Sequence, residues 1–218
     1  PDGFMGIIFM GGPIVPILIS FMIIVIVFSI ERALVLRKAA GKGNVDNFVL
    51  SVRRLLNQNK IDEAIEECDR QEGSVGNVVK EGLTTYKALA HDTTMNKEQK
   101  MVALNKSIEE ATTLEMPMLE KNMMILSTLG TVATLVALLG TVIGMIKAFS
   151  ALGSGGGTPD SAALSIGISE ALVNTALGIG TSAVAIILYN YFTSKIDELT
   201  FKIDEIAMSI QQSFAEFH

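Results

Sequence analysis

Three long stretches of the chain contain no charged side chain. They are bounded by Asp2 and Glu31, by Lys121 and Lys147, and by Glu170 and Lys195. A helix needs roughly 20 residues to cross the hydrocarbon core of a bilayer, and each stretch is longer than that. The pattern therefore predicts three transmembrane helices, at residues 13–32, 122–146 and 166–192.

The sequence between the first two spans, residues 33–121, has a different pattern. Its apolar positions recur every three or four residues, which is typical of amphipathic helices, and glycines and an Asp92-Thr93-Thr94 turn separate the helical stretches. We expect a small helical domain here. The helical period continues from Glu98 into the second span, with a bend at Pro117, and the third span continues into a C-terminal helix at residues 193–218. The predicted fold class is an all-α membrane protein in which helices two and three extend into the cytoplasm.

Positive charges indicate the orientation of the spans. Of the 17 Lys and Arg residues, 14 lie from Arg32 to Lys121 and none precedes Glu31. Because Lys and Arg are enriched in cytoplasmic segments, we expect residues 33–121 and the C-terminus to face the cytoplasm. Residues 1–12 and 147–165 then face outward. Since the first residue is Pro1, we expect the natural start to lie upstream.

Composition excludes several function classes. Only 18% of the residues are charged, the net charge is -6, and there is no basic tract, so nucleic-acid binding is not expected. One cysteine and two histidines provide no metal cluster. The glycine-rich sequence Gly153–Pro159 lacks the Lys-Ser/Thr of a phosphate loop, and no nucleophile and base arrangement emerges. We therefore expect no cofactor, no metal and no enzyme activity.

The second and third spans carry polar and small residues that the first span lacks. On the second span a hydroxyl stripe lies beside a pair of glycines: Ser127, Thr131, Thr134 and Thr141, with Gly140 and Gly144. On the third span one face is small and a neighbouring face is polar: Ala171, Thr175, Gly178, Ser182 and Ala185, then Glu170, Asn174 and Thr181. Polar groups in a membrane face other helices or a wet cavity. The alternative interpretation is that the hydroxyls bond their own helix backbone and the small residues serve packing alone.

Glu170 is the only acidic residue near membrane depth. An acid at the centre of a membrane helix costs about 2.5 to 3.5 kcal/mol on insertion scales, so it needs a partner, protonation or a position near the interface. Because Glu170 begins the third charge-free stretch, an interfacial position and a structural role stay open beside a role in handling protons.

Two segments resemble the MotA/TolQ/ExbB proton-channel family. They are Leu139–Met145 on the second span and Ile168–Gly178, with Leu188–Asn190, on the third. Three spans with a large inner loop are more similar to the ExbB and TolQ branches than to the four-span MotA branch, and ExbB is the most similar. The resemblance implies a proton-channel or stator subunit in a bacterial inner membrane, assembled as a homo-oligomer, with a pentamer as the expected form.

The resemblance also implies partners and site residues. The oligomer is expected to surround the single transmembrane helices of an ExbD- or TolR-like dimer, whose Asp carries the proton, and to energise import through a TonB-like protein. Thr141 and Thr175 match the two pore-facing threonines of the family, and Glu170 matches its helix-three acid. Secondary pore candidates and packing glycines follow by position: Thr134, Asn174, Thr181 and Ser182, then Gly140, Gly144 and Gly178.

The chain departs from the family pattern at three positions. Thr134 and Val184 stand where the family usually has proline, and Asn174 stands where it has a small residue. Kinks at the first two positions are therefore not expected, and Asn174 adds an amide to the third span.

Three other functions compete with the ExbB-like hypothesis. A TolQ-like role in the envelope is the nearest, and a membrane scaffold without ion flux is the second. A secondary transporter is disfavoured, because such transporters carry inverted repeats or broken helices, which this pattern does not show.

Overall fold

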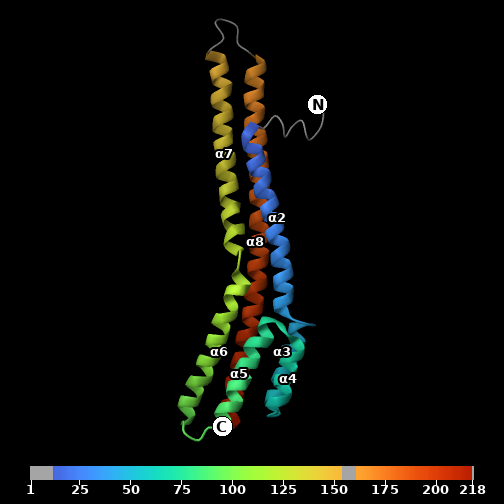
Figure 1. The fold of residues 1–218 in the computed structure, drawn as a ribbon, viewed down its shortest axis with the longest axis vertical. Coiled ribbons are helices and arrows are strands. Elements are labelled where there is room, and N and C mark those ends of the chain that lie inside the picture. Colours follow the sequence, from blue (N-terminus) through green and yellow to red (C-terminus); the bar gives the residue numbers. More distant parts are fainter. Residues whose placement is uncertain (1–11, 154–160, 218) are drawn as a thin grey trace. The chain divides into compact units, whose positions relative to one another are not determined.

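The computed structural model describes residues 12–153 and 161–217. Most of the segment 1–12 and of the glycine-rich sequence lies outside these ranges. The described residues form one short 3-10 helix and a series of α-helices (Figure 1): η1 (Gly12–Ile14), α2 (Val15–Ala40), α3 (Val45–Asn57), α4 (Ile61–Gln71), α5 (Gly73–His91), α6 (Lys97–Glu120), α7 (Met123–Gly153) and α8 (Ser161–Phe217). The segments 12–57, 97–153 and 161–217 are each long and apolar enough to span a membrane. For the described residues, the predicted all-α class with three helices long and apolar enough to span a membrane is confirmed.

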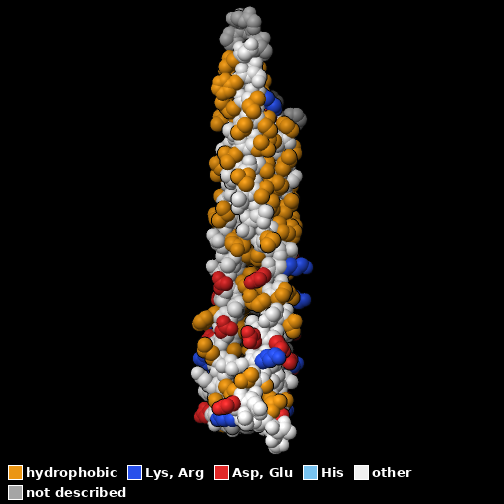
Figure 2. Space-filling model, turned by 90° about the vertical axis from the view of Figure 1, so that its left-hand side faces the viewer, with side chains coloured by type: hydrophobic (Ala, Val, Ile, Leu, Met, Phe, Trp, Pro, Cys, Tyr) orange, Lys and Arg blue, Asp and Glu red, His pale blue; other side chains and the backbone are white. Residues whose placement is uncertain are grey.

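The chain divides into two compact units. The first comprises residues 1–31 and 122–191, and the second comprises residues 32–121 and 192–218. On the face shown in Figure 2, hydrophobic side chains cover most of the first unit, whereas acidic and basic side chains gather on the second. This division follows from the sequence, since the charge-free stretches supply most of the first unit.

The first unit contains α7 and the first parts of α2 and α8. Ile14 and Leu18 pack with Ala137 of α7 in a small buried cluster, against which Leu177 of α8 also packs. Many other large apolar side chains on these helices are exposed, among them Ile30 of α2. So wide an apolar surface is unfavourable in water and suits lipid or further protein.

The second unit is a bundle of α3, α4, α5, α6 and the last part of α8. From Phe192 onward, α8 buries residues at spacings of three and four: Phe192, Ile196, Leu199, Ile203, Ile206, Ile210 and Phe214. This is the amphipathic helical period. The rings of Tyr86 of α5 and Phe214 pack edge to face, with their centroids 4.9 Å apart. Arg53 of α3 forms an ion pair with Glu205, in which Nη2 and Oε1 are 3.0 Å apart.

The second unit differs from the prediction at the end of α6, because helix two does not continue unbroken into its span. Pro117 stays inside α6, the helix ends at Glu120, and Lys121 and Asn122 leave helical geometry, with φ at 63° for Asn122. Asparagine is one of the few residues that tolerate this left-handed conformation. The prediction of one continuous helix bent at Pro117 is therefore wrong.

Arg32 of α2 explains how α6 can end there. Its side chain is fully buried, and Nη1 donates to the carbonyl oxygens of Met118 and Leu119, each at 3.3 Å. In a continuous helix these carbonyls accept from backbone N–H groups four residues further on. The guanidinium thus supplies hydrogen-bond donors to the C-terminal end of α6 and places a positive charge at the negative pole of the helix.

Replacing Arg32 tests this cap. We expect Arg32→Met to lower the free energy of unfolding by about 1–3 kcal/mol, because two buried carbonyls lose a charged donor. Arg37→Met, which removes an exposed arginine from the same helix, is the control and should change little. Thermal unfolding of the purified protein in detergent measures both, and equal midpoints for the two variants would refute the cap.

Candidate functional site

The backbones of α7 and α8 approach each other closely along a line of small residues. A Cβ atom at Gly178 would overlap the Cβ of Ala137, and one at Gly144 would lie 2.8 Å from the carbonyl oxygen of Gly167. A Cβ at Gly140 would lie 2.8 Å from Nδ2 of Asn174. The three glycines assigned to packing thus each face the opposite helix. Gly167 was not among the predicted residues, although it lies one turn before Ala171 and continues the small face of the third span.

Thr141 of α7 and Thr175 of α8 meet at this contact, with their hydroxyl oxygens 2.5 Å apart. Thr141 Oγ1 also lies 3.1 Å from the carbonyl oxygen of Ala137, and Thr175 Oγ1 lies 3.0 Å from that of Ala171. Each hydroxyl has one hydrogen to donate. One threonine therefore donates to the other, and the second donates to a backbone carbonyl. The pair can reverse this order without moving either helix.

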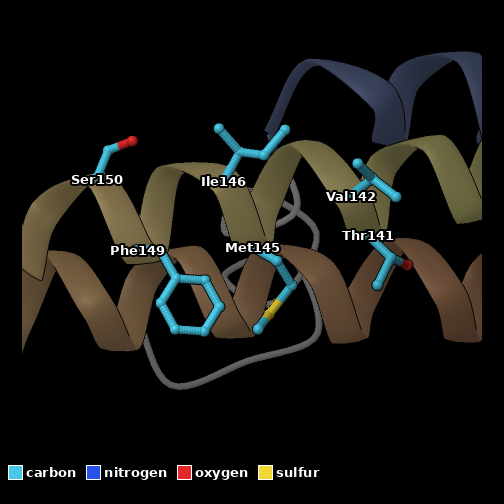
Figure 3. Close-up of a pocket in the computed structure, with 6 residues that line it drawn as sticks. All are labelled: Thr141, Val142, Met145, Ile146, Phe149 and Ser150. Carbon is cyan, nitrogen blue, oxygen red and sulfur yellow. The ribbon is translucent and has the colours of Figure 1, made fainter.

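An apolar hollow runs along α7 and ends at Thr141. It has a volume of ≈ 590 Å³ and is lined by Thr141, Val142, Met145, Ile146, Phe149 and Ser150. Figure 3 shows Thr141, Met145 and Phe149 in a row beside α8, with the other three residues in a second row. Thr141 is half-buried and Phe149 is 63% exposed, so the hydroxyl lies at the inner edge of an open apolar face.

Glu170 forms an ion pair with Lys147 of α7. Its two carboxylate oxygens lie 2.8 and 3.0 Å from Nζ of Lys147. Glu170 is only 5% exposed, whereas the Lys147 side chain is 51% exposed. Gly12 has a positive φ and lies so close that a Cβ there would overlap the carboxylate. In the sequence pattern Lys147 was only the boundary of a charge-free stretch. The available signal was that both residues end a charge-free stretch at the same side of the predicted membrane.

Three of the four secondary candidates are more deeply buried than the threonine pair. Asn174, Thr181 and Ser182 are buried within the first unit, and Ser182 Oγ donates to the carbonyl oxygen of Gly130 on α7. Thr134 is half-buried. None of the four lines the hollow along α7.

Reactive groups for other chemistry are scarce in the part of the chain that the structure describes. Residues 12–153 and 161–217 hold no cluster of His, Cys, Asp and Glu that suits a metal ion. Burial raises the pKa of the Cys68 thiol in α4 to about 12, so it is a poor nucleophile at neutral pH.

Comparison with known proteins identifies the family. The profile of the MotA/TolQ/ExbB proton channel family matches residues 71–205, a range that includes α7, the threonine pair and Glu170. The chain belongs to this family. The resemblance of Leu139–Met145 and Ile168–Gly178 to it is thereby confirmed.

Relatives from three organisms bear ExbB or TolQ names. An ExbB-like 3 biopolymer transport protein of Synechocystis is 33% identical over 51% of this chain and 54% of its own length. An ExbB homologue of Methanothermobacter thermautotrophicus is 26% identical over 94% of this chain and 68% of its own length. TolQ of Pseudomonas aeruginosa is 28% identical over 59% of this chain and 55% of its own length. The chain thus spans about half the length of the two bacterial relatives.

The close approach of α7 and α8 can be tested with a matched pair of glycines. We expect Gly178→Ala to lower the free energy of unfolding by about 1–3 kcal/mol, because the added methyl overlaps Ala137. Gly180→Ala is the control, since a Cβ there meets nothing within 4 Å and alanine favours helix by up to about 1 kcal/mol. Thermal unfolding in detergent decides the question, and a tolerated Gly178→Ala contradicts the packing.

Proposed function

We propose that this chain is the proton-channel subunit of a membrane motor. Together with an ExbD-like single-span partner it uses the proton gradient to energise TonB-dependent import across an outer membrane. The observation that carries the proposal is the Thr141–Thr175 hydroxyl pair, which joins the charge-free stretches of α7 and α8 in a member of a proton-channel family. The relatives named ExbB support the import role.

The threonine pair suits a passage that a partner completes. A reversible pair of hydroxyls can donate to or accept from water or a carboxyl group without gaining a net charge. Its position at the inner edge of an exposed apolar face of α7 suits contact with a transmembrane helix of the partner. In this proposal five copies of the chain surround the partner helices, Thr141 and Thr175 face the passage, and the partner's Asp carries the proton.

The orientation of the chain follows from its positive charges. The proposal places the chain in a bacterial inner membrane, with residues 33–121 and the C-terminus in the cytoplasm. The reason is that 14 of the 17 Lys and Arg residues lie from Arg32 to Lys121, and such residues are enriched in cytoplasmic segments. Protons are the coupling ion, and the mechanism requires no cofactor.

Glu170 has a supporting role in this mechanism. A group that carries protons across a membrane works best near the middle of the barrier. Glu170 instead ends a charge-free stretch, and Lys147, which ends another, neutralises it. In this proposal the ion pair holds α7 and α8 together on their outward side, one to two helical turns from the threonine pair.

A TolQ-like role is the second candidate, because TolQ of Pseudomonas aeruginosa is among the relatives. Deletion of the gene separates the two roles. Loss of energised outer-membrane uptake with an intact envelope supports the import role, whereas leakage of periplasmic proteins with normal uptake supports the Tol role.

Removing either hydroxyl tests the passage. We expect Thr141→Val and Thr175→Val to lower proton flux in the reconstituted complex at least about tenfold, which corresponds to roughly 1.4 kcal/mol in the barrier. Stability should fall by only about 0.6 kcal/mol, the average value of a hydrogen bond between membrane helices.

Thr141→Ser is the matched control for this prediction, because it keeps the hydroxyl and loses only a methyl group. It should retain most of the flux. Parental flux in both valine variants would contradict the passage, and a parent complex that conducts no protons would leave the non-conducting scaffold as the function.

Glu170→Gln and Lys147→Met test the ion pair from its two sides. Both remove the attraction across α7 and α8, so we expect both to reduce proton flux partly and to preserve assembly. Removing the partner's Asp should abolish flux. If Glu170→Gln abolishes flux in an intact complex while Lys147→Met does not, Glu170 is itself the proton carrier.

A further inference from the structure

Asn174 is a buried amide without a hydrogen-bond partner. The residue is 0% exposed, and neither Nδ2 nor Oδ1 has a partner in the described structure. An amide offers two donors and two acceptor sites, and burial of such groups unpaired is unfavourable, most of all in a membrane.

Two other buried polar side chains of the first unit have partners. Ser182 donates to the carbonyl oxygen of Gly130 across the same helix contact, and Ser29 donates to the carbonyl oxygen of Val25 within α2. Asn174 instead lies against Gly140, which has no side chain to offer it. Among the described residues of the first unit, Asn174 is the one whose buried side-chain polar atoms have no partner.

The Asn174–Gly140 contact lies directly beside the Thr141–Thr175 pair. Gly140 and Thr141 are consecutive on α7, and Asn174 and Thr175 are consecutive on α8. Thr141 also ends the hollow along α7. Thr141 therefore borders both the hollow and Gly140, the residue that the amide contacts.

We propose that Asn174 is a water-binding site between α7 and α8, filled when the two helices part at Gly140 during proton transfer. The ligand has to donate and accept hydrogen bonds and be small enough to pass between two threonines. Water has both properties. The amide neither gains nor loses a proton. It holds water beside the Thr141–Thr175 pair and thereby adds a hydrogen-bonding group to the passage. This inference rests on the proposed function.

Substitution of Asn174 distinguishes a water site from ordinary packing. We expect Asn174→Ala to raise the midpoint of thermal unfolding, because the unpaired amide is gone, and to lower proton flux of the complex about tenfold. Asn174→Ser keeps a group that binds water and should restore part of the flux. Ser29→Ala is the control, since it removes a satisfied buried hydroxyl of α2 and should leave flux unchanged without raising the midpoint.

This experiment distinguishes a failure of the proposed function from a failure of the water site at Asn174. A parent complex without proton flux refutes the proposed function. A conducting parent together with parental flux in Asn174→Ala refutes the water site, and so does equal loss of flux in the alanine and serine variants.

Cysteine labelling tests the same site without relying on stability. Asn174→Cys should react with a small water-soluble thiosulfonate at least tenfold faster in the conducting complex than Ala185→Cys, which replaces another fully buried residue of α8. The native Cys68 is buried and does not compete at neutral pH. Equal labelling of the two introduced cysteines overturns the proposal.

Discussion

The first unit depends on the close approach of α7 and α8. Between apolar helices in lipid, burial of hydrocarbon gives little driving force, so van der Waals contact and hydrogen bonds have to hold the helices together. Gly144 with Gly167, and Gly178 with Ala137, bring the two backbones within reach of each other. The hydroxyl contacts between α7 and α8 depend on this approach, because short hydroxyl side chains cannot bridge a wider gap.

The antiparallel course of α7 and α8 sets the order of these polar contacts. Lys147 meets Glu170, Thr141 meets Thr175, and further along Gly130 meets Ser182. The charges lie at the ends of the charge-free stretches, and the hydroxyls lie within them. Polar groups thus occur where hydrogen bonds or an ion pair compensate their transfer from water, with the amide of Asn174 as the exception.

The second unit is stabilised by different means. Its α8 segment buries a regular apolar stripe, as helices in water do, and places Glu205 against Arg53 on a neighbouring face. The last carbonyl groups of α6 need hydrogen-bond donors, and the buried guanidinium of Arg32 provides them. A buried arginine is stable only where hydrogen bonds satisfy it, so residue 32 and the carbonyls of Met118 and Leu119 depend on one another.

The sequence by itself determined the number of membrane helices, the fold class and the family. Uncompensated charge in hydrocarbon is so costly that the lengths of charge-free sequence identify the spans. The helical period likewise identified the small faces of the second and third spans. The tertiary structure alone decided which residues meet. Two of these contacts join groups 23 or more positions apart: Lys147 pairs with Glu170, and Arg32 binds the end of α6. The third feature is that the buried amide of Asn174 has no partner. Such contacts follow from the rotation and register of packed helices, which a local period of 3.6 residues does not specify.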